Sequence, residues 1–163
     1  MTAAALVLAA LAVWGVAGVW LAVTDRRSRI LPTRIIWSTG AVVWVLYVAA
    51  SLVAGEPGGL VGAAIGAAIC GAALAVVHFA HPPSLGFGDV RLSVLNGLVC
   101  GWWGWQAALL GLMAGFLVAL PEALVTLIRD GPRASRPLGH YLVVGAVAVA
   151  IYSAVGGGLV PFA

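Results

Sequence analysis

Long apolar runs, separated by short polar loops, dominate the chain from one end to the other. An apolar run of about 18 or more residues can cross the ~30 Å hydrocarbon core of a membrane as a helix. Such runs cover approximately residues 3–23, 35–53, 60–79, 92–128 and 140–160. This pattern predicts an all-α, polytopic membrane protein that forms one membrane-embedded domain, residues 1–163.

The run over residues 92–128 is too long for one crossing. It is interrupted by Gly101-Trp102-Trp103-Gly104-Trp105, and tryptophan is enriched where helices meet the membrane–water interface. We therefore expect a short fourth helix before this segment and a fifth that ends near Ile128, which makes six transmembrane helices. Glycines four residues apart, such as Gly62 and Gly66, fit close packing between these helices.

The basic side chains divide the loops into two sets. All eight Lys and Arg residues are arginines in or beside the loops between helices one and two, three and four, and five and six: Arg26, Arg27, Arg29, Arg34, Arg91, Arg129, Arg133 and Arg136. With six helices these three loops share one side of the membrane, and arginine-rich loops face the cytosol. We therefore expect the N- and C-termini to lie outside the cytosol.

Composition narrows the class of protein further. The sequence is 63% hydrophobic and 8% charged, which is too few charges to cover the surface of a soluble domain. The formal net charge of +3 comes from loop arginines and forms no basic stripe, so we expect no nucleic-acid partner. Cys70 and Cys100 lie in apolar runs without a Cys-x-x-Cys pair, so we expect neither a metal nor a cofactor.

Two aspartates stand where apolar runs meet the arginine-bearing loops. Asp25 lies in Thr24-Asp25-Arg26-Arg27-Ser28-Arg29-Ile30-Leu31-Pro32, and Asp89 lies in Gly86-Phe87-Gly88-Asp89-Val90-Arg91-Leu92. A carboxylate at a membrane edge is costly unless it is solvated, paired or used in function. Taken singly, Asp25 could be solvated and neutralised by Arg26 or Arg29, and Asp89 could cap the helix that follows it.

The predicted topology places both aspartates on the cytosolic side at similar depth, where they can approach each other. Two close carboxylates do not both ionise readily, so such a pair shares a proton. One carboxylate, as a base, can activate a water while its protonated partner polarises a scissile carbonyl. Gly86 and Gly88 would let backbone and substrate approach Asp89 closely. Asp25 and Asp89 therefore predict the catalytic pair of an aspartic protease.

These motifs resemble those of the type IV prepilin leader peptidases, a family of intramembrane aspartic peptidases with a Gly-x-Gly-Asp motif. The run from Gly86 to Leu92 is similar to the family's usual Gly-x-Gly-Asp-x-Lys-Leu, with Arg91 in place of Lys. Asp25, followed by basic residues and then by Pro32, resembles the family's first catalytic aspartate, with Thr33 in place of the usual Asn.

A third segment carries the same resemblance. Arg136-Pro137-Leu138-Gly139-His140-Tyr141-Leu142-Val143-Val144-Gly145 is similar to the Pro-x-Gly-Pro stretch that opens the family's last helix, with His140 in place of the second Pro. The resemblance thus touches all three arginine-bearing loops and follows the order of the helices.

The resemblance implies an aspartic endopeptidase of the bacterial cytoplasmic (inner) membrane. Its substrates would be prepilins or pseudopilins, cut after a short basic leader at the cytosolic face, and its surroundings would be membrane lipid. Family prepilins carry an acidic residue shortly after the cut, which Arg91 could contact. We expect no counterpart of the large cytosolic domain of the bifunctional members, with its paired Cys-x-x-Cys and its N-methylation activity. We therefore expect the short, peptidase-only form that serves Tad/Flp-type pili.

The residues leave some alternatives open. A small membrane transporter would use Asp25 and Asp89 as a proton or cation relay, and the relay would continue deeper through further polar residues. Arg91 would either position substrate or only set topology. Glu122 would be either a pore-facing residue near Arg129 or an acid close to the site.

Three other polar residues are placed by their positions in the runs. We expect His140 and Tyr47 at the membrane interface, because both stand near the ends of predicted helices. Asn96 falls inside the fourth predicted helix, where it is expected to hydrogen-bond to another helix.

Overall fold

Helices make up almost all of the part of the chain that the structure, a computed structural model, describes: residues 2–28, 31–80, 85–130 and 138–161. The elements are α1 (Ala3–Ser28), α2 (Thr33–Ala54), α3 (Gly58–Ala80), α4 (Phe87–Cys100), the 3₁₀ helix η1 (Gly101–Trp103), α5 (Trp105–Asp130) and α6 (Gly139–Gly157). Of the arginines expected in the loops, Arg29, Arg133 and Arg136 lie outside the described residues.

The length and the apolar composition of the helices indicate a multi-pass membrane protein. All of the α-helices except α4 are long and apolar enough to cross a membrane. The 14 residues of α4 give a length of about 21 Å at 1.5 Å per residue, which is short of a hydrocarbon core of ~30 Å. A short helix suffices here because α4 lies inside the bundle, where 10 of its 14 residues are buried.

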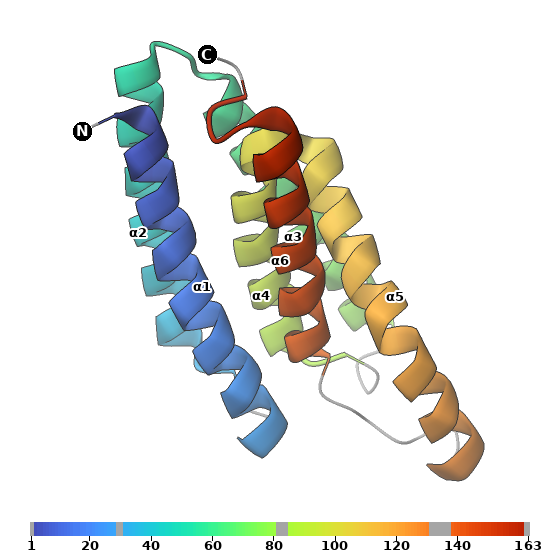
Figure 1. Ribbon diagram of the computed structural model, residues 1–163. Coiled ribbons are helices and arrows are strands. Elements are labelled where there is room, and N and C mark those ends of the chain that lie inside the picture. Colours follow the sequence, from blue (N-terminus) through green and yellow to red (C-terminus); the bar gives the residue numbers. More distant parts are fainter. Residues whose placement is uncertain (1, 29–30, 81–84, 131–137, 162–163) are drawn as a thin grey trace.

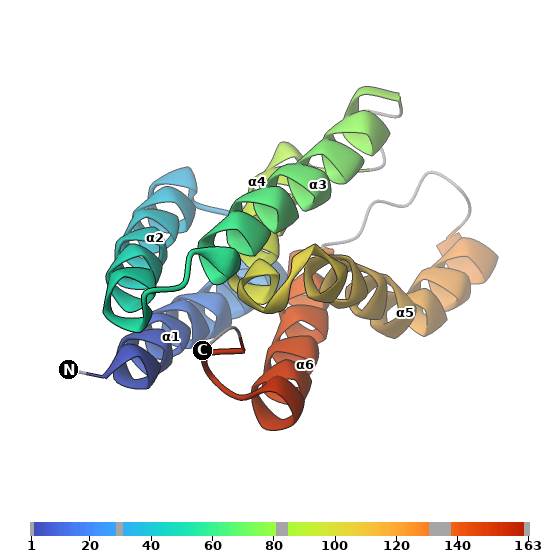
Figure 2. The same ribbon diagram turned by 90° about the horizontal axis from the view of Figure 1, so that it is seen from above.

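The helices run alternately up and down, with α4 at the centre. Figure 1 shows that α1 begins and α6 ends at one end of the bundle, while α2, α4 and α6 begin at the other. Viewed from above in Figure 2, α1 and α2 form one side, α5 and α6 another, and α3 a third. α4 contacts α2, α3, α5 and α6, and α1 contacts α2 and α6.

Glycines bring α3 into backbone contact with α4 and with η1. A Cβ added to Gly66 would lie 2.5 Å from the Gly97 carbonyl oxygen, and one added to Gly62 would lie 2.4 Å from the Gly101 carbonyl oxygen. Because no larger side chain fits at such distances, these positions set the packing of α3 against α4 and η1. The glycine spacing read from the sequence is therefore used for close packing, as predicted.

The tryptophan-rich segment closes the end of the bundle away from the arginines. Trp102 is 2% exposed, packs its ring 4.4 Å from that of Tyr47 and donates its indole N–H to the Leu159 carbonyl at 2.9 Å. Trp103 donates likewise to the Gly158 carbonyl at 2.8 Å. The predicted break between two helices at this segment is confirmed. Trp102 and Tyr47, which were expected at the membrane interface, are both buried, Tyr47 with 0% exposure, so their rings pack in the core and do not face lipid headgroups.

Candidate active site

Asp25 and Asp89 lie at the same end of the bundle and are both buried. α1 continues past Asp25 to Ser28, so Asp25 lies within its last turns, and Asp89 lies in the first turn of α4. Their exposed fractions are 4% and 7%. Simple solvation of Asp25 beside the membrane is therefore excluded, because its carboxylate faces the protein interior.

The Asp25 carboxylate is held against the N-terminus of α6. Its Oδ2 accepts a hydrogen bond from the His140 backbone N–H at 3.3 Å, and the His140 imidazole Nδ1 stands 3.7 Å from the same oxygen. A Cβ on Gly139 would lie 2.9 Å from Oδ2, so glycine leaves room for the carboxylate. The N-terminus of a helix stabilises negative charge, which explains why Asp25 is tolerated in this buried position.

Asp89 is not the N-cap residue of α4, because Gly86 occupies that position; it lies in the first turn, where its carboxylate receives a backbone hydrogen bond from Gly86. The Asp89 backbone N–H donates to the Gly86 carbonyl at 3.1 Å. Asp89 also lies outside the five helices that are long enough to cross a membrane. Burial, and then the charge of Asp25, raise the pKa of its carboxyl to about 7, against a smaller lowering effect of a backbone hydrogen bond from Gly86. The two carboxylates therefore feel each other's charge.

Leu31 connects the two halves of this site. A Cβ added to Gly88 would lie 3.0 Å from the Leu31 Cβ, and one added to Gly139 would lie 3.2 Å from the Leu31 Cδ1. Leu31 thus lies against both α4 and α6 immediately after the helix that carries Asp25. Gly88 is needed for this internal contact, whereas a Cβ on Gly86 would make only an ordinary contact of 3.4 Å with the Asp89 carboxylate.

Arg91 ties α4 to α2. Its Nη1 donates a hydrogen bond to the Thr33 hydroxyl, and its guanidinium lies over the Phe87 ring, 4.6 Å from the ring centroid, in a cation–π arrangement. Arg91 and Thr33 are the two positions where this sequence departs from the family's usual Lys and Asn, and they contact each other. Arg91 also lines an apolar groove of about 310 Å³ between α2 and α4. A role in positioning substrate stays a prediction.

His140 is the site residue that sequence reasoning placed wrongly. It was expected at the interface, but it is 8% exposed and contacts Asp25 through both its backbone and its ring. The available signal was its position in the third segment of the family resemblance, beside Gly139 at the start of a helix. Glu122 of α5 is within electrostatic range of the His140 ring, which favours a place near the site over a purely pore-facing one.

The described residues contain no cluster of three or more side chains suited to a metal. His78 is used structurally, because its Nδ1 is 2.7 Å from the Leu85 carbonyl oxygen and its ring packs 5.3 Å from that of Phe87. This contact holds the segment that leads into the Gly-x-Gly-Asp motif.

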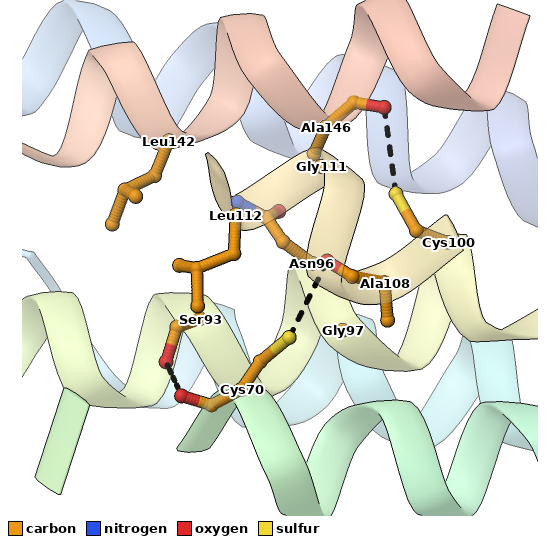
Figure 3. Close-up of a pocket in the computed structure, with 10 residues that line it drawn as sticks. All are labelled: Cys70, Ser93, Asn96, Gly97, Cys100, Ala108, Gly111, Leu112, Leu142 and Ala146. Carbon is orange, nitrogen blue, oxygen red and sulfur yellow. Dashed lines mark hydrogen bonds between the residues drawn. The ribbon is translucent and has the colours of Figure 1, made fainter. Parts of the chain in front are cut away.

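A second polar region lies deeper in the bundle, around a small cavity of about 10 Å³ (Figure 3). This volume admits about one water molecule. Cys70 and Cys100 direct their thiols to the Ala108 and Ala146 carbonyls, each at 3.5 Å. Asn96 accepts a hydrogen bond from the Trp14 indole at 3.1 Å, which confirms its predicted interhelical role.

Searches against protein-family models, curated proteins and solved structures found no match. The class of this molecule therefore follows from its own fold and site. It is an all-helical protein with several membrane-spanning helices and with two buried, electrostatically coupled carboxylates at one end of the bundle.

Proposed function

We propose that this protein is an intramembrane aspartic endopeptidase that cleaves the short leader of prepilins or pseudopilins at the cytosolic face of the bacterial cytoplasmic membrane. The observation that carries the proposal is the pairing of Asp25 with Asp89. These residues stand 64 positions apart in the sequence, and the fold buries both at one end, where the charge of one acts on the other. The resemblance of their motifs to those of the prepilin peptidases supplies the substrate class.

The burial and the charge coupling of the pair support peptide hydrolysis. One carboxylate takes a proton from water as the water oxygen attacks the scissile carbonyl, and the other gives its proton to the carbonyl oxygen. The tetrahedral intermediate then collapses, the C–N bond breaks, and the leaving amine takes up a proton. A carboxyl with a pKa raised to about 7, as that of Asp89 is, holds the required proton near neutral pH. This chemistry needs no cofactor.

The positions of the arginines indicate how the protein is oriented in the membrane. Arg26, Arg27 and Arg91 lie on the same end of the bundle as the carboxylates, and arginine-rich ends face the cytosol. We therefore place cleavage at the cytosolic face, with the beginning of α1 and the end of α6 outside the cytosol. A basic leader would remain on the cytosolic side while the apolar part of the pilin stays in the membrane.

A proton or cation relay is supported less well. The deeper polar side chains that line the central cavity, Ser93 and Asn96, do not titrate, and the Ser93 hydroxyl donates to the Val90 and Cys70 carbonyls at 2.7 and 3.1 Å. Within the described residues, no carboxylate or histidine lines this cavity. Among the described residues, the buried carboxylates and the buried histidine, Asp25, Asp89 and His140, gather at one end, which suits a protease pair.

Co-expression with a candidate prepilin from the same cell tests the proposal. We expect the pilin to become shorter by its leader, seen as a mobility shift and as a new N-terminus by mass spectrometry. Glu56→Gln is a matched control, because Glu56 is an exposed carboxylate in the loop after α2, away from the pair. Pilins that all stay full-length beside a folded, membrane-inserted protein would contradict the proposal.

A further inference from the structure

The apolar groove of about 310 Å³ between α2 and α4 begins at the end of the bundle where both helices start. Figure 2 shows α4 between α2 and α3, and Ala67 of α3 lies at the edge of the groove. Because Arg91 of α4 bonds to Thr33, the first residue of α2, the two helices lie in register. The groove therefore runs along both helices, from their first turns inward.

The wall formed by α2 has two aromatic rings with small residues between them. Trp37 and Trp44 are seven residues apart, which is about two helical turns, and they are 52% and 38% exposed. Gly40 and Ala41 lie between them and also line the groove. A Cβ added to Gly40 would make only an ordinary contact, at 3.7 Å from the Leu95 Cδ1. The small residues thus leave the space between the two rings open to the surroundings.

Positive charge stands at the start of the groove. Arg91 lines it, and its guanidinium has five N–H donors, of which the Thr33 hydroxyl receives one. Arg34 is exposed and lies one turn before Trp37, on the same face of α2. Within the described part of the chain, no carboxylate lines the groove. The groove therefore suits a ligand with an anionic head and an apolar body.

The dimensions of the groove distinguish a hydrocarbon chain from a helix. From Arg91 to Leu98 the groove covers seven residues of α4, or about 10 Å, which lies within the ~15 Å of one leaflet of a ~30 Å hydrocarbon core. Spread over about 10 Å, a volume of about 310 Å³ gives a cross-section of about 30 Å². A helix ~10 Å across would need about 80 Å², so a single acyl chain fits better.

We infer that this groove binds an anionic phospholipid of the adjacent leaflet, with one acyl chain between α2 and α4 and its phosphate beside Arg91 and Arg34. Basic pockets between membrane helices are typical sites for anionic lipid headgroups, and a guanidinium can donate two parallel hydrogen bonds to a phosphate. The inference depends on the membrane class of the protein and not on the proposed peptidase activity.

Quenching of tryptophan fluorescence by brominated lipids tests the inference on the full chain. The protein is reconstituted in phosphatidylcholine vesicles that contain one part in ten of phosphatidylglycerol, with bromine on the acyl chains of one lipid or the other. The chain has seven tryptophans, so the signal of Trp37 is the difference between the wild type and Trp37→Phe. We expect phosphatidylglycerol to be preferred at Trp37 by about fivefold or more, the effect typical of an arginine beside an anionic lipid.

Removal of single charges tests the position of the headgroup. Arg91→Gln should lower the preference about fivefold, and Arg34→Gln should lower it by a smaller factor, because Arg34 is more exposed. Arg129→Gln is the matched control, since it removes an exposed arginine from the last turn of α5, on another side of the bundle (Figure 2). This control should leave the preference unchanged.

A pair of neighbouring substitutions tests the position of the acyl chain. Ala41→Phe fills the groove from the wall formed by α2, so it should reduce quenching of Trp37 by both lipids and reduce the preference between them. Val42→Phe adds a ring at the next residue, which is also exposed but does not line the groove, and should change neither. Circular dichroism checks that each variant folds.

Three results would overturn the inference. Equal quenching of Trp37 by both brominated lipids would show that bulk lipid fills the groove without selection. Absence of quenching by either lipid would show that a protein, such as a second copy of this chain, covers it. A preference that both Arg91→Gln and Arg34→Gln retain would place the phosphate elsewhere. If Arg91→Gln does not fold without its contact to Thr33, Arg34→Gln alone decides this last point.

Discussion

The two ends of the bundle differ in how the polar atoms of their buried rings are paired. At the end formed by η1 and the close of α6, the polar atoms of the buried rings are paired: Trp102 with the Leu159 carbonyl, and Tyr47 with the Val99 carbonyl at 3.3 Å. At the opposite end, two carboxylates that repel each other lie buried beside an imidazole whose ring nitrogens have no hydrogen-bond partner within the described part of the chain. The first arrangement stabilises the fold, whereas the second costs free energy, as is typical of groups placed for chemistry.

The largest effect should come from removing one carboxylate of the pair. Asp25→Asn and Asp89→Asn keep the shape of each side chain but cannot exchange the proton, so each should lower cleavage by about 10³-fold or more. Cleavage of the co-expressed pilin measures this, while denaturation in detergent should show unchanged or higher stability. Full cleavage by either variant would show that the two aspartates do not act as a pair.

Substitutions at the tryptophan-rich end of the bundle should change stability alone. Trp102→Ala removes a fully enclosed ring and should lower the free energy of unfolding by about 3–5 kcal/mol. Trp102→Phe loses mainly the hydrogen bond to the Leu159 carbonyl and should cost about 1 kcal/mol. Denaturation in detergent measures both, and the folded fraction should keep its activity. Loss of cleavage by folded Trp102→Phe would contradict the claim that this end of the bundle contributes to stability alone.

The site end should also show a pH dependence. Because the pKa of Asp89 is raised to about 7, its proton is present below this pH and is lost above it. We therefore expect cleavage to fall as the pH rises through about 7, by about tenfold for each further unit. Cleavage rates of the reconstituted protein, measured from below to above pH 7, test this expected fall. A rate that stays level well above this range would mean that Asp89 does not supply a proton.

The smallest expected effect belongs to Arg91. Arg91→Lys keeps the charge and matches the family's usual residue, so it should retain most of the cleavage. Arg91→Gln should weaken cleavage of a normal pilin by a factor of about two to five and matter less for a pilin that lacks the acidic residue after the cut. Equal loss with both pilins, at unchanged expression and topology, would assign Arg91 to its contact with Thr33 alone.

The sequence predicted the all-helical membrane class, the break at the tryptophan-rich segment and the close helix packing at glycine, because each depends on local hydropathy and composition. It also placed Asp25 and Asp89 at one end, since the alternation of helices fixes which loops share a side. The roles of His140 and Tyr47 could not be read in the same way. A residue near the end of an apolar run can face lipid headgroups or the protein interior, and only packing between distant helices decides which.

The helix boundaries differ for a related reason. α1 continues past the first arginines to Ser28, and α4 begins at Phe87, five residues before the apolar run at Leu92. Hydropathy marks the part of a helix that lies in an apolar layer, whereas hydrogen bonding continues into polar flanks. These extensions put Asp25 and Asp89 inside helices, where their backbones are rigidly held.

The central claim is that Asp25 and Asp89 together hydrolyse a peptide bond at one end of the bundle. Its most direct test uses the purified protein in liposomes with a purified prepilin in heavy-oxygen water, followed by mass spectrometry of both products. The account predicts a single cut at the end of the basic leader, with one heavy oxygen in the new leader carboxylate and none in the mature pilin. An intact prepilin beside folded protein, with proton flux across the liposome membrane that Asp25→Asn abolishes, would contradict it.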